Sequence, residues 1–244
     1  MNQSTLEKMH LMNLSGMAAA YKEFFTIDNH YEWSHEQLLA FLLDNEYDER
    51  KTSTIQRRIK QANFVDNQAC IEGIKYLTDR ELNVNLISLL SSNDYIQNGQ
   101  NVLIIGATGA GKSYVACALG HQACLQNYKT LYIRLPDLIV EIKMARAEGK
   151  LPSLLKKYAK LDLLIIDEWL LTPLDTIEVS DILEVIERRT NKHSTIICSQ
   201  IQISGWYERL GESAITEALL DRILSKAHRI EIKGKESMRS RTDY

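Results

Sequence analysis

Two patterns of apolar residues divide the chain near residue 100. Before that point the apolar side chains recur at helical spacing, as Leu86, Leu89 and Leu90 do. After it, short apolar runs alternate with helical stretches, which is typical of a parallel sheet with crossover helices. We therefore predict an α/β fold in which an all-helical N-terminal domain, residues 1–95, precedes a sheet domain, residues 96–244.

Local signals support both halves of this division. Ser34 and Gln37 precede an apolar run at the spacing of a capping box, which predicts the start of a helix. Asn98-Gly99 is a turn signal and the expected domain boundary. Five segments share the short apolar runs of buried parallel strands: 101–105, 129–134, 161–167, 194–199 and 228–232.

A glycine-rich loop follows the first predicted strand and opens a helix. It has the spacing G-x-x-x-x-G-K-[ST], which is typical of a nucleoside triphosphate site. Glycines allow successive N–H groups to face phosphate oxygens, and the helix N-terminus adds its partial positive charge. We expect Lys112 to reach the β- and γ-phosphates and the Ser113 hydroxyl to bind Mg²⁺. The predicted cofactor-binding residues are Gly106, Ala107, Thr108, Gly109, Ala110, Gly111, Lys112, Ser113 and Tyr114.

Two carboxylates, Asp167 and Glu168, end the uninterrupted apolar run of the third strand. In an open α/β sheet, ligands bind beyond the carboxyl ends of the strands, where the phosphate loop also lies. We therefore predict that Asp167 holds Mg²⁺, directly or through water, and that Glu168 orients and polarises the attacking water.

Two further residues are catalytic candidates on weaker signals. The fourth strand ends in Ser199-Gln200, and a polar side chain there, predicted to be Ser199, would reach the γ-phosphate or the water. Arg222 lies on an amphipathic helix and either reaches the γ-phosphate bound to a neighbouring subunit or forms an ordinary ion pair on its own chain. The sequence does not separate these two interpretations.

Guanine specificity is not expected. A GTPase would carry N-K-x-D, whereas Asn191-Lys192-His193-Ser194 has serine in place of the aspartate. This tetrapeptide is predicted to be a loop before the fourth strand.

Composition limits where DNA could bind. The formal net charge is −3, so DNA contact requires a local basic patch, repeated by oligomerisation. The candidates are Lys143, Arg146 and Lys150 after the second strand, and Arg57 and Arg58 in the helical half; each set is equally well explained as a solvated helix face.

The same composition predicts a reduced, cytoplasmic protein. The four cysteines show neither a C-x-x-C pair nor zinc spacing, so we expect thiols in the core. No apolar signal stretch or run of about 20 apolar residues is visible, so no membrane contact is expected.

Taken together, these motifs resemble the AAA+ ATPases of the DnaC group and, within it, the IstB family of ATP-binding helpers encoded beside transposases. The similar segments are Asn101–Gly120 with GATGAGKS, Leu163–Leu174 with LLIIDEWLLTPL, Ser194–Gln200, Leu220–Arg222 and Gly234–Arg239. The stretches Leu11–Ala18 and Glu46–Arg50 favour the transposition helpers over the helicase loaders.

The resemblance implies a P-loop AAA+ core and an ATP- and Mg²⁺-dependent ATPase. It further implies a homo-oligomer that binds and deforms double-stranded DNA and recruits the transposase of its own element. A DnaC-type replicative helicase loader is the alternative. A small-molecule kinase and a nucleotide-switched scaffold that hardly hydrolyses ATP are less well supported.

Two features depart from the family pattern. Leu170 stands where the family often has glycine, which questions the local turn shape. Only a dozen residues follow the fifth strand, so no C-terminal helical lid is expected, and Arg239 or Arg241 would have to replace a second sensor arginine.

Overall fold

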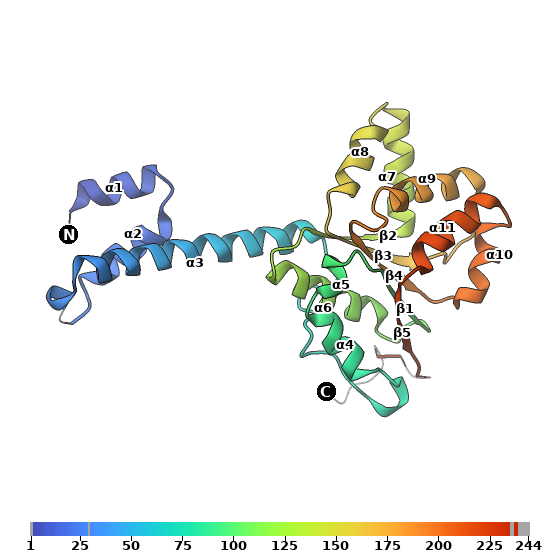
Figure 1. Cartoon of the computed structure of the whole chain (residues 1–244), viewed down its shortest axis with the longest axis horizontal. Coiled ribbons are helices and arrows are strands. Elements are labelled where there is room, and N and C mark those ends of the chain that lie inside the picture. The colour runs from blue at the N-terminus through green and yellow to red at the C-terminus, as the bar shows by residue number, and fades with distance from the viewer. Residues whose placement is uncertain (1, 29, 235–236, 239–244) are drawn as a thin grey trace. The chain divides into compact units, whose positions relative to one another are not determined.

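The computed structural model describes the chain except for residues 1, 29, 235–236 and 239–244 (Figure 1). It divides into two compact units, Met1–Arg57 and Arg58–Tyr244. Each unit has its own packing and is described separately.

The N-terminal unit is helical. It contains α1 (Gln3–Leu11), α2 (Ser15–Phe24), η1 (His30–Glu32) and most of the long helix α3 (His35–Ala62). The capping box before α3 is confirmed: the Gln37 N–H donates to the Ser34 hydroxyl, and the Ser34 N–H donates to the Gln37 side chain.

A close helix contact and a small polar network hold this unit together. A Cβ on Gly16 would lie 2.5 Å from the Asn45 carbonyl oxygen, so only glycine lets α2 approach α3 this closely. The buried Glu46 carboxylate accepts the Met17 N–H at 3.0 Å and pairs with Arg50. Arg50 also donates to the Asn13 carbonyl, which ties α3 to the turn between α1 and α2.

The second unit is built on a five-stranded parallel sheet with the order β2-β3-β4-β1-β5. Its strands are β1 (Val102–Gly106), β2 (Thr130–Arg134), β3 (Leu163–Trp169), β4 (Ser194–Ser199) and β5 (His228–Ile232). All five predicted strands are therefore confirmed to within about two residues at their ends.

Helices cover both faces of this sheet (Figure 1). On one face lie α4 (Val84–Ser91), α5 (Asp94–Gln97) and α6 (Lys112–Leu125). On the other lie α7 (Leu135–Ala147), α8 (Leu151–Ala159), α9 (Thr176–Glu187), α10 (Trp206–Leu210) and α11 (Ala214–Leu224), with η3 (Ile203–Gly205) before α10. Along β3 the side chains alternate between the two cores, as the period of two in a strand requires.

The expected domain boundary at residue 95 differs from the division that the structure shows. Residues after Arg57 belong to the unit that carries the sheet. Phe64, Ile74 and Leu90 pack in the same core as the β1 and β3 side chains Ile104 and Ile165. The physical reason is coverage: this sheet face is apolar, and the segment before β1 buries it together with α6.

Cys117, Cys124 and Cys198 are buried free thiols, as expected, whereas Cys70 is exposed. Burial raises the pKa of Cys117 to about 11, so this thiol stays protonated at neutral pH. Among the described residues, none of the helices combines the length and apolar character needed to cross a bilayer.

Candidate nucleotide-binding site

The glycine-rich loop joins β1 to α6 at the carboxyl edge of the sheet. Gly109 and Gly111 have φ of +78° and +91°, a region that other residues rarely adopt. These conformations turn the chain sharply enough for α6 to begin at Lys112, directly after the loop. The loop therefore has the backbone geometry that the sequence spacing predicted.

Carbonyl groups of the loop are already hydrogen-bonded. The Lys112 ammonium, which is buried, donates to the carbonyl oxygens of Gly106 and Ala107 at 2.8 and 2.9 Å. Within the described part of the chain, the N–H groups of Gly109 and Gly111 have no recorded acceptor. These N–H groups are therefore available to an anion.

Burial lowers the pKa of Lys112, and the nearby Cys198 and Asp167 partly oppose that effect. A phosphate group beside the ammonium would favour its charged form further. The site therefore holds a buried ammonium group, that of Lys112, where a phosphate group would bind.

Asp167 lies at the centre of a hydrogen-bond cluster. Its Oδ2 accepts from the Ser113 hydroxyl and from the Tyr132 hydroxyl, each at 2.6 Å, and its Oδ1 accepts the Glu168 N–H at 2.7 Å. The predicted metal pair, Ser113 and Asp167, is therefore brought into direct contact. The role of Tyr132 was not predicted. The only sequence signal for it is a hydroxyl-bearing side chain within the otherwise apolar part of β2.

Tyr132 is buried, and its hydroxyl donates to a carboxylate. Burial raises the pKa of this phenol, and the hydrogen bond to Asp167 raises it further. Tyr132 consequently stays protonated and keeps the Asp167 side chain aimed at Ser113.

Glu168 has an unusual backbone conformation. Its φ is +56° and that of Leu170 is +55°, and the pairing of β3 with β4 shifts register between Ile166 and Trp169. Leu170 thus takes the left-handed conformation that a glycine would adopt freely. This irregular turn presents the Glu168 side chain at the rim of the cavity.

Arg134, at the end of β2, faces Glu168. The Arg134 guanidinium lies 3.9 Å from Glu168 Oε1 and donates two hydrogen bonds to Asp137. The pairing is loose and about half exposed, so it leaves Glu168 able to bind water.

A cavity of about 730 Å³ joins these groups. It is lined by the loop and Lys112, Ser113, Tyr114, Tyr132, Arg134, Asp167, Glu168 and Gln200, with Val65, Asp66 and Met238 at its border. The predicted phosphate, metal and carboxylate residues therefore share one cavity within the Arg58–Tyr244 unit.

The prediction for Ser199 was wrong. Its side chain is buried, and its hydroxyl bonds with the carbonyl oxygens of Trp169 and Ile201. The next residue, Gln200, lines the cavity instead and accepts a hydrogen bond from Thr108 at 2.5 Å. Ser199 has a structural role in the turn after β4.

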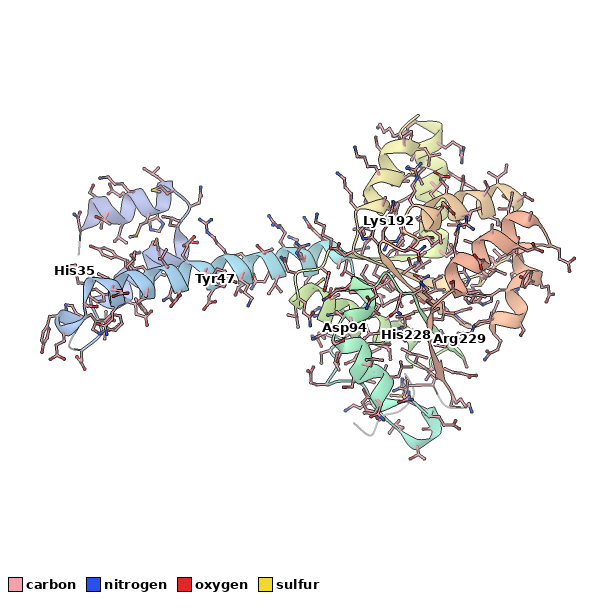
Figure 2. All side chains as sticks on the ribbon, in the orientation of Figure 1. His35, Tyr47, Asp94, Lys192, His228 and Arg229 are labelled. Carbon is pink, nitrogen blue, oxygen red and sulfur yellow. The ribbon has the colours of Figure 1, made fainter. Side chains whose placement is uncertain are left out.

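Arg222 lies at the opposite, amino-terminal edge of the sheet. Its carbonyl oxygen accepts from Asn101, which precedes β1, while its guanidinium pairs with Glu187 and donates to the Ala218 carbonyl. Figure 2 labels Lys192, which lies shortly before β4, and His228 and Arg229, which begin β5. Within one chain, Arg222 therefore forms the ion pair that was one of its two interpretations, and it does not line the loop cavity.

The basic residues predicted to meet DNA are mostly paired. Lys143 and Arg146 on α7 form ion pairs with Glu178 and Asp181 on α9. Lys150 pairs with Glu148, and Arg58 donates to the Asn127 side chain. Of the five candidates, Arg57, which is exposed, and Arg58 have no ion pair recorded among the described residues.

The tail positions Arg239 and Arg241 lie outside the described residues. Of the preceding tail, Ser237 and Met238 are described, and the Met238 N–H donates to the Gly109 carbonyl at 2.9 Å. The described part of the tail thus contacts the phosphate loop. The two candidates for a second sensor arginine follow it in the sequence.

The residues present fit a magnesium nucleotide. Free loop N–H groups and a buried ammonium suit phosphates, and a hydroxyl beside a carboxylate offers the hard oxygen donors that Mg²⁺ prefers. Phosphate oxygens and water would supply the remaining oxygen ligands that Mg²⁺ prefers.

Comparisons with known proteins agree with this geometry. The family model described as IstB-like ATP binding protein matches residues 7–244. A putative insertion-sequence ATP-binding protein of Sinorhizobium fredii is 37% identical over 235 residues, which cover 96% of this chain and 95% of that protein. The putative ATP-binding protein of insertion sequence IS1162 from Pseudomonas fluorescens is 40% identical over 204 residues, which cover 84% and 88% of the two chains.

Solved structures share the fold of the second unit. The DnaC helicase loader superposes with a TM-score of 0.55 at 21% identity and covers 68% of this chain and 97% of its own. The replication initiator DnaA, bound to AMPPCP and single-stranded DNA, gives a TM-score of 0.58 at 15% identity, with 72% and 53% covered. At these identities the likeness concerns the AAA+ fold alone.

Proposed function

The chain belongs to the family of IstB-like ATP-binding proteins, and on that basis we propose that it is an ATP-hydrolysing, DNA-binding oligomer that prepares target DNA for a transposase. The observation that carries the proposal is the cluster of Lys112, Ser113, Asp167 and Glu168 around one cavity. Relatives named as insertion-sequence proteins supply the biological context.

Nucleotide binding would begin with the phosphate loop. The free N–H groups of Gly109 and Gly111 would donate hydrogen bonds to the phosphate oxygens, and the Lys112 ammonium would turn from two loop carbonyls toward the β- and γ-phosphates. This exchange replaces neutral acceptors by charged ones, which strengthens each hydrogen bond to the ammonium.

Hydrolysis would rely on the two carboxylates of β3. When bound, Mg²⁺ neutralises phosphate charge and acts as a Lewis acid on the phosphate oxygens. Ser113 and Asp167 are the residues that would hold it, and Tyr132 keeps Asp167 in position. Glu168 would accept a hydrogen bond from the attacking water and take up its proton, and Gln200, directly after β4, lines the same cavity.

Assembly would complete the site. Because Arg222 lies at the sheet edge opposite its own loop, it would reach a γ-phosphate only in another subunit. The ion pair with Glu187 would then hold the guanidinium until a neighbour docks. ATP bound between subunits would favour the homo-oligomer by mass action.

The DNA surface that we propose lies at the amino end of the edge strand β2. Arg58, Lys129 and Lys157 line one shallow cavity there, and Lys160 follows at the end of α8. In the described chain, Lys129 and Lys160 are exposed without a recorded ion pair, and Lys157 has only a 3.6 Å pairing with Glu141. Less neutralised cations attract phosphates better than the paired residues of α7.

The relatives favour transposition over helicase loading. Their names refer to insertion sequences, whereas the likeness to the DnaC loader extends to the fold alone. We accordingly propose that the protein partner is the transposase of the same element, and that the protein acts in the cytoplasm. Co-purification with that transposase, and not with a replicative helicase, checks this choice.

A mixing experiment tests the shared site. Arg222→Ala and Lys112→Ala subunits are each expected to hydrolyse little ATP, because each lacks one side of every interface. Mixed on DNA, they are expected to recover part of the activity, since an intact Lys112 then faces an intact Arg222 at some interfaces. Absence of recovery in mixtures that co-assemble by light scattering would contradict the shared site.

A further inference from the structure

Arg80 is a buried arginine beneath the phosphate loop. It ends the short η2 helix (Thr78–Arg80), which lies before β1 and outside the loop motif. One guanidinium nitrogen donates to the Ala110 carbonyl at 2.9 Å, and another donates to the Lys75 carbonyl. A single side chain thus joins the segment before the sheet to the middle of the loop.

The loop is shaped to admit this arginine. A Cβ on Gly111 would lie 2.8 Å from the Arg80 guanidinium, so the glycine leaves room for the side chain as well as adopting its positive φ. The Arg80 carbonyl in turn accepts the N–H of Lys233, the first residue after β5, at 3.0 Å. The Arg80 residue therefore contacts the loop through its side chain and the tail through its backbone.

Two loop carbonyls are fixed by donors from outside the motif. The Ala110 carbonyl accepts from Arg80, and the Gly109 carbonyl accepts from the Met238 N–H. A peptide group whose carbonyl points one way directs the N–H of the same plane the other way. Fixing the Ala110 carbonyl on Arg80 therefore fixes the direction of the Gly111 N–H, which is among the groups available to phosphate.

We propose that Arg80 is a positioning residue of the nucleotide site, which orients the loop N–H groups and adds a buried positive charge beneath the phosphates. The inference rests on the proposed function, because it assumes that the loop binds nucleotide. It assigns to the segment before β1 a direct part in ATP affinity. Because the Arg80 guanidinium is buried, water screens its charge only weakly.

Three variants test this role. Arg80→Gln removes the charge and most of the donors, Arg80→Lys keeps the charge but not the planar fork, and Arg189→Gln is the matched control. Arg189 is equally buried and donates to the carbonyls of Tyr158, Leu161 and Ser194, but it lies at the amino edge of the sheet. For each full-length variant, the Kd of a fluorescent ATP analogue with Mg²⁺ and the thermal midpoint are measured.

We expect Arg80→Gln to raise the Kd about tenfold and Arg80→Lys about threefold. Arg189→Gln should lower the thermal midpoint and leave the Kd within about twofold, because a structural defect remote from the loop does not alter phosphate contacts. Without nucleotide, amide exchange at residues 107–111 should be faster in Arg80→Gln than in the control.

The inference is overturned if folded Arg80→Gln binds the analogue as the unmodified chain does, or if Arg189→Gln loses as much affinity. If Arg80→Gln does not fold, Arg80→Lys decides alone: an unchanged Kd overturns the inference and a loss of about threefold supports it. A failure of the proposed function has another signature, since the unmodified chain would then bind no nucleotide.

Discussion

The two units of the chain differ in charge and in what holds them together. Residues 1–57 contain five basic and nine acidic residues, a formal net charge of −4. The remaining residues contain 24 basic and 23 acidic residues, a net charge of +1. The overall charge of −3 therefore conceals an acidic helical unit and a nearly neutral sheet unit.

Packing separates them further. The sheet unit has an apolar core on each face of its sheet, whereas the N-terminal unit is held by a few buried apolar side chains such as Phe24, by the close approach at Gly16 and by the Glu46–Arg50 network. An acidic unit is poorly suited to phosphates, so the comparison favours the sheet unit for the DNA contact that we propose. The four predictions below test that separation.

Glu168→Gln should have the largest effect. It keeps the size of the side chain but removes the base, so steady-state ATP turnover should fall by about 10²–10⁴-fold while ATP binding remains. Phosphate release and analogue binding measured on the same preparation check both parts. Turnover at the original rate would assign the base to another residue.

Lys112→Ala should weaken ATP binding by about 100-fold, because the buried ammonium, which bonds two loop carbonyls in this structure, would donate charged hydrogen bonds to the phosphates. Titration with a fluorescent ATP analogue measures the loss. Far-ultraviolet circular dichroism should be unchanged, since neither core contains Lys112. Undiminished affinity in the variant would refute the site.

The loop and the acid pair were predictable because their chemistry depends on residues that are adjacent in sequence. The position of Ser199 was not predictable. Where a strand ends in two polar residues, the local turn decides which side chain faces the cavity, and here it is that of Gln200. Arg80 and Tyr132 act across long sequence separations, which a spacing pattern cannot reveal. The domain boundary was misplaced because a helical pattern does not tell which core the helix covers.

The stretches Leu11–Ala18 and Glu46–Arg50, on which the resemblance partly rested, lie together in the structure. They contact each other, since Gly16 and Met17 meet Asn45 and Glu46. The resemblance identified both stretches, but the sequence did not indicate that they form one interface.

Gly16→Ala should destabilise the N-terminal unit by about 1–3 kcal/mol, because the added methyl group collides with the α3 backbone. Thermal melts of the full chain should show an earlier transition for this unit, and the Kd for ATP should not change. A parallel loss of ATP affinity would show that the two units do not behave separately.

The DNA surface should give the smallest effect per residue. Lys129→Glu combined with Lys160→Glu should weaken DNA binding about five- to tenfold and reduce the salt dependence of the affinity. Lys150→Glu, at a lysine already paired with Glu148, serves as the control. Fluorescence anisotropy with duplex DNA at two salt concentrations compares the two. A greater loss in the control would instead favour Lys143, Arg146 and Lys150 as the DNA surface.

Hydrogen–deuterium exchange with and without ATP and Mg²⁺ tests the central claim most directly, at a concentration where the chain is monomeric. The account predicts slower exchange in segments 75–80, 106–114 and 167–168, and no change in α2. The same protection should be absent from Lys112→Ala. Protection of α2, or none in the phosphate loop, would contradict the claim that the nucleotide site lies wholly within the Arg58–Tyr244 unit.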